Sequence, residues 1–92
     1  MMGNRELSGK KRNRSRIDED ELFRSLSHKI RRDIIKILGE NPLSFSEVIN
    51  NLENVDSPTL SYHLKSLQPY LQQKESKYEL SGIGEVAFNL LS

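Results

Sequence analysis

The chain has 92 residues, of which 14 are Lys or Arg and 13 are Asp or Glu, so its formal net charge is +1. This length allows one small domain and excludes multidomain enzymes. The absence of cysteine excludes disulfides and thiolate-metal sites, and no apolar run approaches the roughly 20 residues that cross a membrane. We therefore expect a soluble, cytoplasmic protein with no membrane partner.

The charges are unevenly distributed along the chain. Residues 1–16 contain six basic side chains and one acid, a net charge of +5, whereas residues 17–92 contain eight basic and twelve acidic residues, a net charge of −4. Because residues 1–16 have little apolar surface, their composition predicts a disordered arm. A basic arm favours contact with nucleic acid. Its candidate DNA-binding residues are Lys10, Lys11, Arg12, Arg14 and Arg16.

Two helices are predicted first in residues 17–92. Four acids at positions 18–21 precede Leu22, Phe23 and Leu26, which is typical of a short helix with acids at its positive end. A second helix is expected to begin after Ser27 as N-cap and to end at Gly39. Its apolar stripe consists of Ile30, Ile34, Ile37 and Leu38.

Four cations of this second helix lie outside its apolar stripe. They are Lys29, Arg31, Arg32 and Lys36. Solvent exposure alone explains such cations, and contact with DNA phosphates is the alternative. Among them we include Arg31 in the candidate DNA-binding set.

A helix-turn-helix is predicted next. Residues 44–47, Ser-Phe-Ser-Glu, fit a capping box and begin a third helix. Asn54 suits the left-handed conformation of a tight turn. Ser57 and Pro58 are expected at the N-cap and first position of a fourth helix, which Pro69 ends. Two short helices joined by a four-residue turn form this motif.

The fourth helix has one apolar face and one hydrogen-bonding face. At 100° per residue, Leu60, Leu64 and Leu67 share a buried stripe, and His63 lies at its boundary, where we favour a partly buried structural role. The opposite side contains Thr59, Tyr62, Lys65 and Ser66. No acid occurs between Thr59 and Gln68, so this face can bond to phosphates or to base edges in a major groove.

The last part of the chain predicts a β-hairpin and a final helix. Residues 70–74 and 77–80 suit two short strands, with Lys74 and Lys77 on either side of the tip. Ser81 is expected to cap a helix with a wide apolar stripe, part of which is a candidate subunit interface. The stripe consists of Ile83, Val86, Ala87, Leu90 and Leu91.

Residues 82–87 match the dinucleotide pattern G-x-G-x-x-G/A, but the structural context does not fit. That fingerprint needs a following parallel strand and an acid about 20 residues on. We therefore interpret the glycines as turn and helix-start residues and expect no cofactor. No cysteine, and no histidine with an adjacent nucleophile, supplies catalytic roles, so we expect that the protein is not an enzyme.

The predicted order of elements is that of a winged helix-turn-helix, a mainly α fold with a small β-hairpin (α+β). Three segments resemble ArsR-type winged-helix regulators: LSHKIRRDIIKIL (26–38), LSFSE (43–47) and SPTLSYHLKSL (57–67). The hairpin and the Leu80-Ser81 pair also fall where that family has its wing and following helix. The resemblance covers residues 22 to about 88, and Ser-x-x-Leu-Ser-Tyr-His-Leu is its most specific part.

The resemblance implies a dimeric transcription regulator whose fourth helix lies in the major groove and whose wing touches the DNA backbone or minor groove. By position, it implies that Ser57, Thr59, Ser61 and Tyr62 read DNA, that Lys65 meets phosphate, and that Lys74 and Lys77 act on the wing. Metal-sensing relatives use cysteines or clusters of His and Asp. Since this chain has no Cys, and His28 and His63 lie on different elements, we do not expect metal sensing.

We therefore expect a nucleoid-associated, sequence-specific regulator that binds double-stranded DNA as a homodimer. Residues 1–16 would form the arm, and residues 17–92 the winged helix-turn-helix domain with terminal helices for dimerisation. Two recognition helices would address half-sites about 34 Å apart. The sequence identifies no small-molecule effector. The alternative is a winged-helix module of the transcription machinery that binds proteins and has no DNA affinity, which the acidic body favours.

Overall fold

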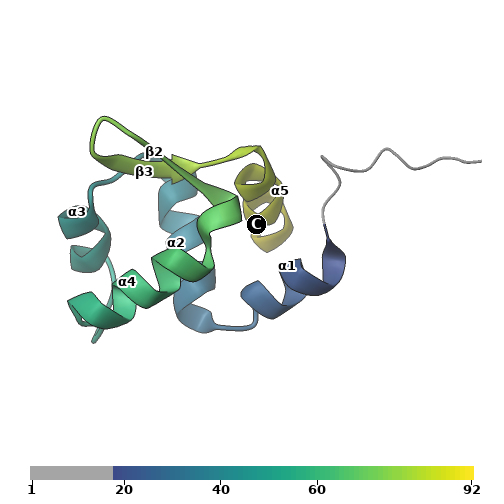
Figure 1. Cartoon of the computed structure of the whole chain (residues 1–92), viewed down its shortest axis with the longest axis horizontal. Coiled ribbons are helices and arrows are strands. Elements are labelled where there is room, and N and C mark those ends of the chain that lie inside the picture. Colours follow the sequence, from purple (N-terminus) through teal and green to yellow (C-terminus); the bar gives the residue numbers. More distant parts are fainter. Residues whose placement is uncertain (1–17) are drawn as a thin grey trace, which may run out of the picture.

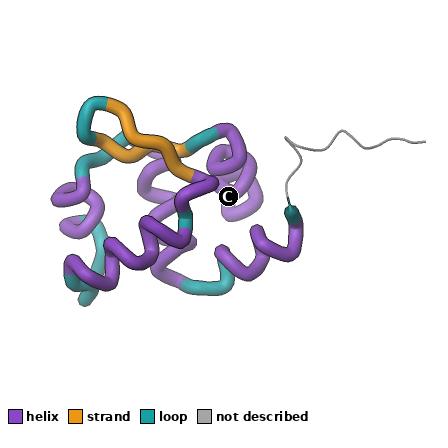
Figure 2. Tube along the Cα trace, in the orientation of Figure 1, coloured by secondary structure: helices purple, strands orange, loops and turns teal. Residues whose placement is uncertain are grey.

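The computed structural model describes residues 18–92, and the predicted basic arm of residues 1–16 lies outside them. The fold consists of helices and one antiparallel hairpin (Figures 1 and 2). This confirms the predicted α+β, winged-helix class. In chain order the elements are α1 (Glu19–Ser25), α2 (Lys29–Glu40), α3 (Phe45–Asn50), α4 (Ser57–Ser66), the 3₁₀ turn η2 (Gln68–Tyr70), β2 (Leu71–Lys74), β3 (Lys77–Leu80) and α5 (Gly82–Leu91).

Helix α2 is the centre of the core. It packs against α4, α5 and β3, and its Ile34 and Ile35 are fully buried. The predicted apolar stripe did not include Ile35. This residue is buried because α2 is covered by other elements on more than one side, so that a wider arc of the helix than one stripe lies in the core. The prediction that Gly39 ends this helix is wrong, since α2 continues to Glu40. A Cβ at Gly39 would overlap the Phe88 ring of α5, so this glycine permits close helix packing.

Side chains cap the starts of α3 and α4, and the N-caps of α2 and α4 each differ by one residue from the predicted ones. The capping box of α3 is confirmed: the Glu47 backbone N–H donates to Ser44 Oγ, and the Ser44 N–H donates to Glu47 Oε1 at 2.8 Å. The N-cap of α4 is Asp56 rather than Ser57, because its carboxylate accepts the Thr59 N–H at 2.9 Å. His28 rather than Ser27 is the N-cap of α2, and the Ser27 hydroxyl instead donates to the Arg24 carbonyl.

Helices α3 and α4 form the predicted helix-turn-helix. Asn54 has a φ of 59°, which confirms its left-handed conformation in the turn. Leu60 and Leu64 of α4 and Val48 of α3 are buried together in the core. This packing leaves the outer side of α4 uncovered at the front of Figure 1.

The hairpin follows α4 and is attached to the body at its base. Its strands pair Leu71 with Leu80 and Lys74 with Lys77. Tyr70 is buried in η2, so the first strand begins one residue later than predicted. Tyr78 exchanges two backbone hydrogen bonds with Leu43, which precedes α3, at 2.7 and 3.0 Å. These bonds fix the hairpin relative to the helix-turn-helix.

Helix α5 begins after Ser81, whose hydroxyl accepts the Gly84 N–H and confirms the predicted cap. A Cβ at Gly84 would collide with the Tyr70 carbonyl, so glycine allows α5 to approach η2. Ala87 is fully buried, whereas Val86 and Leu90 are exposed. Within residues 18–92, no helix is both long and apolar enough to cross a membrane.

Candidate nucleic-acid interface

The outer face of α4 exposes hydrogen-bonding side chains and one cation. Tyr62 is 61% exposed, and Ser57, Ser61 and Lys65 are also exposed. Helix α4 contains no acid. Hydroxyls and an ammonium group on one uncovered helix can donate to phosphates and bond to base edges. We call Ser57, Ser61, Tyr62 and Lys65 the α4 face.

Two residues predicted on this face are less accessible than the wheel indicated. Thr59 and Ser66 are half-buried. The buried arc of α4 extends toward them because His63 is 7% exposed and therefore belongs to the buried side. Ser61, on the other side of the helix, is exposed. The family resemblance, more than the helical periodicity, had assigned Ser61 to the DNA-binding side.

Arg31 is buried, which contradicts the expectation of an exposed cation on α2. Only 8% of its surface is accessible, and its Nε donates to Nδ1 of His63 at 3.1 Å. The guanidinium carbon lies 5.9 Å from the centre of the Tyr62 ring. Arg31 therefore contacts α4 on its buried side, at His63, and does not present a free cation to solvent.

Arg31 belongs to a cluster that joins the start of α2 to α4. The His63 ring lies 5.2 Å from the Tyr62 ring and 5.7 Å from the His28 ring, measured between ring centres. The two histidines are on different elements, as predicted, but the fold makes them neighbours. Sequence spacing gave no signal of this cluster, because 32 positions separate Arg31 from His63. Residues 18–92 hold no group of three or more His, Cys, Asp or Glu side chains that could bind a metal ion.

The environment of His63 disfavours its charged form. Burial is the main reason that its pKa is below the usual value, and the positive charges of Arg31 and His28 lower this pKa further. The neutral ring is also the form that the Arg31 hydrogen bond requires, since Nδ1 must accept. His63 is thus expected to be uncharged at neutral pH.

This lowered pKa predicts that acidification destabilises the fold. Between the usual histidine pKa of about 6.5 and the lower value of folded His63, the unfolded chain binds more protons, so the free energy of unfolding falls as pH falls. Urea unfolding of the full chain between pH 7.5 and 5 measures this loss. The pKa values of Glu47 and Asp56 are also lowered by hydrogen bonds with Ser44 and Thr59, but their contribution is lost mainly near and below pH 4. His63→Gln should flatten the curve between pH 7.5 and 5, and an unchanged slope would show that His63 does not cause the loss of stability.

The other cations of α2 differ in their availability. Lys29 pairs with Asp33 at 2.7 Å, and Arg32 Nη1 donates to the Leu26 carbonyl at 2.7 Å. Lys36 is exposed, and no carboxylate in residues 18–92 lies within ion-pair distance of it. Among the α2 cations, Lys36 is therefore the best candidate for the alternative interpretation, contact with a DNA phosphate.

The hairpin carries two cations next to its turn. Lys74 and Lys77 are directly opposite each other in the register, and both are exposed. Glu75 and Ser76 between them have φ values of 54° and 68°, so the turn is tight. On the same hairpin, the Glu79 carboxylate accepts a hydrogen bond from Gln72 at 2.6 Å. Residues 74–77 hold two lysines and Glu75, so the net charge of the tip is +1. Lys77 also helps to lower the pKa of the Glu47 carboxyl of α3.

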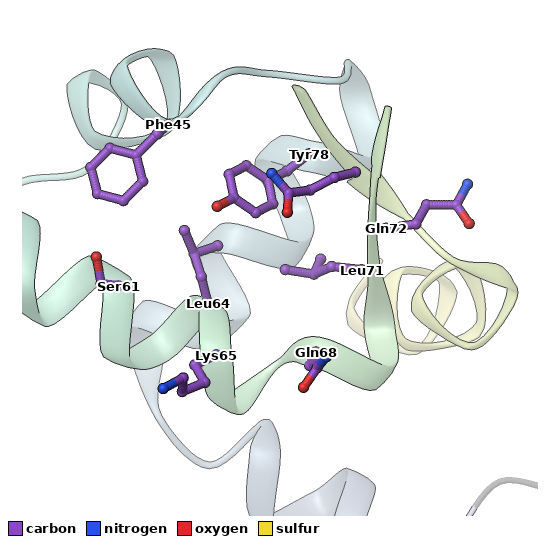
Figure 3. Close-up of a pocket in the computed structure, with 9 residues that line it drawn as sticks. Phe45, Ser61, Leu64, Lys65, Gln68, Leu71, Gln72 and Tyr78 are labelled. Atoms are coloured by element: carbon purple, nitrogen blue, oxygen red, sulfur yellow. The ribbon is translucent and has the colours of Figure 1, made fainter. Parts of the chain in front are cut away.

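A hollow of about 410 Å³ separates α4 from the hairpin. Figure 3 shows Ser61, Leu64 and Lys65 on its α4 side and Tyr78 across from them. Its lining mixes apolar side chains such as Leu64 and Leu71 with polar ones such as Ser61. The α4 face and the hairpin thus form two ridges with a depression between them.

Comparison with known families matches residues 19–91 to the family described as Domain of unknown function (DUF7347). The chain belongs to this family. The DUF7347 match begins at the first residue of α1 and ends at the last residue of α5, so it includes every described helix and strand. Searches of curated proteins and of solved structures find no significant match to the chain.

Proposed function

We propose that the protein is a sequence-specific transcriptional regulator of the ArsR-like winged-helix type that binds double-stranded DNA as a homodimer. One observation carries the proposal: α4 exposes an acid-free hydrogen-bonding face across a hollow from a hairpin that carries two lysines, on a body whose net charge is −4. In such an acidic body, an acid-free helix face with one lysine, together with two lysines next to the hairpin turn, favours an anionic partner. A helix-turn-helix presents this surface in the form that enters a major groove.

The chemistry of the α4 face suits base reading with few phosphate contacts. Ser61 and Tyr62 have hydroxyls that donate and accept, and Lys65 supplies a charge at the side of the helix. The positive end of α4 is already occupied by the Asp56 carboxylate. We therefore expect phosphates at Lys65 and the hairpin, and not at the α4 N-terminus.

The hairpin lysines support the same partner. Like charges directly opposite each other in an antiparallel pair destabilise it. Lys74 and Lys77 form such a pair. The Glu47 carboxylate, whose pKa Lys77 helps to lower, offsets part of their repulsion, and a further anion beside the two lysines would offset more of it. A DNA phosphate near the wing supplies that anion.

Exposed apolar side chains on α1 and α5 support the homodimer. Phe23 is 65% exposed and Leu90 is 60% exposed, and both helices lie at the same end of the long axis in Figure 1. Large exposed apolar groups of this kind mark interaction sites when they gather on one surface. Self-association about a two-fold axis would bury Phe23 and Leu90 of both protomers in the same interface.

The dimer predicts a change of mass in one variant. In sedimentation equilibrium the full chain should have twice the mass of one chain, whereas Leu90→Glu should be monomeric at the same concentration, because it places a charge in an apolar interface. Lys36→Glu adds a similar charge on α2 and should stay dimeric. A wild-type chain that is monomeric at every concentration would refute this part of the proposal.

Removal of residues 1–16 should reduce the salt dependence of duplex binding. Each neutralised phosphate contributes about −0.9 to the slope of log K against log salt, and the removed segment has six basic side chains. The slope should therefore become shallower by several units at most, with weaker binding to every sequence. Titration of labelled duplex at several salt concentrations measures it. Equal slopes for the two chains would show that the arm does not contact DNA.

A gel-shift with mixed-sequence duplex tests the proposal itself. We expect the full chain to retard the duplex at low salt and to release it as salt rises. The acidic charge of the body favours the alternative, a protein-binding module without DNA affinity. No retardation at low salt would favour that alternative.

A further inference from the structure

Arg31 is a buried cation with no acidic partner in the described part of the chain. It is 8% exposed, and the ion pair found in residues 18–92 joins Lys29 to Asp33 and does not include it. A buried charge costs free energy unless other groups hold it. The groups that hold Arg31 are the His63 ring, through a 3.1 Å hydrogen bond, and the Tyr62 ring, 5.9 Å from the guanidinium carbon.

These two contacts connect a buried residue to an exposed one. His63 and Tyr62 are adjacent on α4, and their ring centres lie 5.2 Å apart at an angle of 69°. His63 is buried, whereas Tyr62 projects from the α4 face. Arg31 reaches both from α2, so the Tyr62 ring is held on one side by a cation and on another by the histidine ring.

We propose that Arg31 is a positioning residue for DNA reading: held by neutral His63, its guanidinium fixes the Tyr62 ring in its reading orientation, and protonation of His63 releases it. The inference rests on the proposed function, because it assigns Tyr62 a part in binding DNA. It adds a residue that does not itself touch DNA, and a condition under which the recognition helix is less well ordered.

Protonation of His63 breaks the arrangement for a geometric reason. Nδ1 would then carry a hydrogen, so it could no longer accept from Arg31 Nε, and two cations would be 3.1 Å apart. The charged and titratable groups that face His63 are Arg31 and His28 from the start of α2 and Tyr62 from α4 itself. No carboxylate in residues 18–92 acts on it. Protonated His63 therefore has no local counter-ion, and Arg31 must move away.

The sign of the pH effect separates this device from ordinary electrostatics. Protonation of histidines near a polyanion adds positive charge and strengthens binding as pH falls. Release of Arg31 predicts the opposite, a loss of affinity as pH falls. If only the neutral form of His63 supports tight binding, affinity falls about tenfold for each pH unit below the pKa of His63.

The test measures binding of the full chain to a duplex selected from random-sequence DNA, between pH 7.5 and 5 at constant salt. The wild type should lose affinity as pH falls. His63→Gln should keep its affinity, because the amide oxygen still accepts from Arg31 but does not titrate. Arg31→Met should bind about tenfold more weakly at pH 7.5, with no loss on acidification. Arg24→Met removes one exposed cation from α1 and should behave like the wild type. Circular dichroism at each pH confirms that every variant is folded.

Two results would overturn the proposal. One is the same pH dependence in the wild type and in His63→Gln, and the other is unchanged affinity in folded Arg31→Met at pH 7.5. NMR of the free chain keeps the inference separate from the proposed function. The Tyr62 ring signals should follow the titration of His63 with the same midpoint. If no duplex binds at any pH, the proposed function fails, and Tyr62 signals that ignore His63 would refute the positioning role independently.

Discussion

Replacing Leu60 by alanine is expected to lower the free energy of unfolding by about 2 to 5 kcal/mol. Leu60 is fully buried and lies in the core between the helices. Small domains have a total stability of roughly 5 to 15 kcal/mol, so this loss removes a large part of it. The cavity would open beneath α4 itself, and this helix would lose one of its fully buried apolar side chains. Urea unfolding followed by circular dichroism measures the change.

Tyr62→Ala is the matched control for this variant. Tyr62 lies two residues away on the same helix but projects from the exposed side. Its loss should cost only about 1 kcal/mol, because most of the Tyr62 side chain stays exposed and the contact that it gives up is that of its ring with the Arg31 guanidinium. Similar losses for Leu60→Ala and Tyr62→Ala would contradict the assignment of buried and exposed faces on α4.

The double variant Ser61→Ala and Tyr62→Ala is expected to remove most of the sequence preference. A good contact to a base edge contributes about 1 to 3 kcal/mol of discrimination. If each of these two exposed residues contributes near the low end, the ratio of specific to mixed-sequence affinity falls about 30-fold for each half-site, and about 10³-fold for the two half-sites of a dimer. Binding to mixed sequence should change little, because Lys65 and the hairpin lysines remain. Competition between selected and mixed-sequence duplexes measures the ratio.

Lys65→Met serves as the control for that experiment. A phosphate contact carries no sequence information, so its loss should weaken binding to all duplexes about equally and reduce the salt slope by about one unit for each protomer. Preserved specificity in the double variant would show that the α4 face does not read bases. Lost specificity in Lys65→Met would show that Lys65 has a different role from the one proposed.

The parts of the fold that sequence predicts well are those fixed by residues close together in the chain. The capping box of Ser44 and Glu47 spans three residues, and the left-handed Asn54 depends on its own side chain and the turn around it. The hairpin follows from two short apolar patterns around a two-residue turn, and Ser81 caps the helix directly after it. Local chemistry decides each of these, so the sequence alone predicts them.

The sequence predictions were wrong where contacts between elements far apart in the chain determine the structure. Gly39 resembles a helix stop, yet Phe88 of α5 packs against it and the helix continues. Ile35 is outside the predicted stripe, yet α2 is buried on more than one side. The bridge between Leu43 and Tyr78 also joins segments far apart in the chain. Periodicity within one helix carries no information about such contacts.

In the candidate site too, features fixed by local sequence were predicted correctly, and features fixed by distant contacts were not. The helical wheel predicts that Tyr62 and Lys65 are exposed, and the structure confirms both. It misplaces Thr59 and Ser66, because the burial of His63 widens the covered arc of α4. The burial of Arg31 depends on His63, which is 32 positions away, and no spacing rule connects them.

Selection of duplexes from random-sequence DNA by the full chain, followed by measurement of their affinity, tests the central claim most directly. We predict enrichment of a two-fold symmetric sequence whose half-sites are about 34 Å apart, bound at least 10³-fold more tightly than mixed-sequence duplex at physiological salt. Recovery of no preferred sequence, with equal affinity for every duplex or for none, would contradict the claim that this winged helix reads DNA.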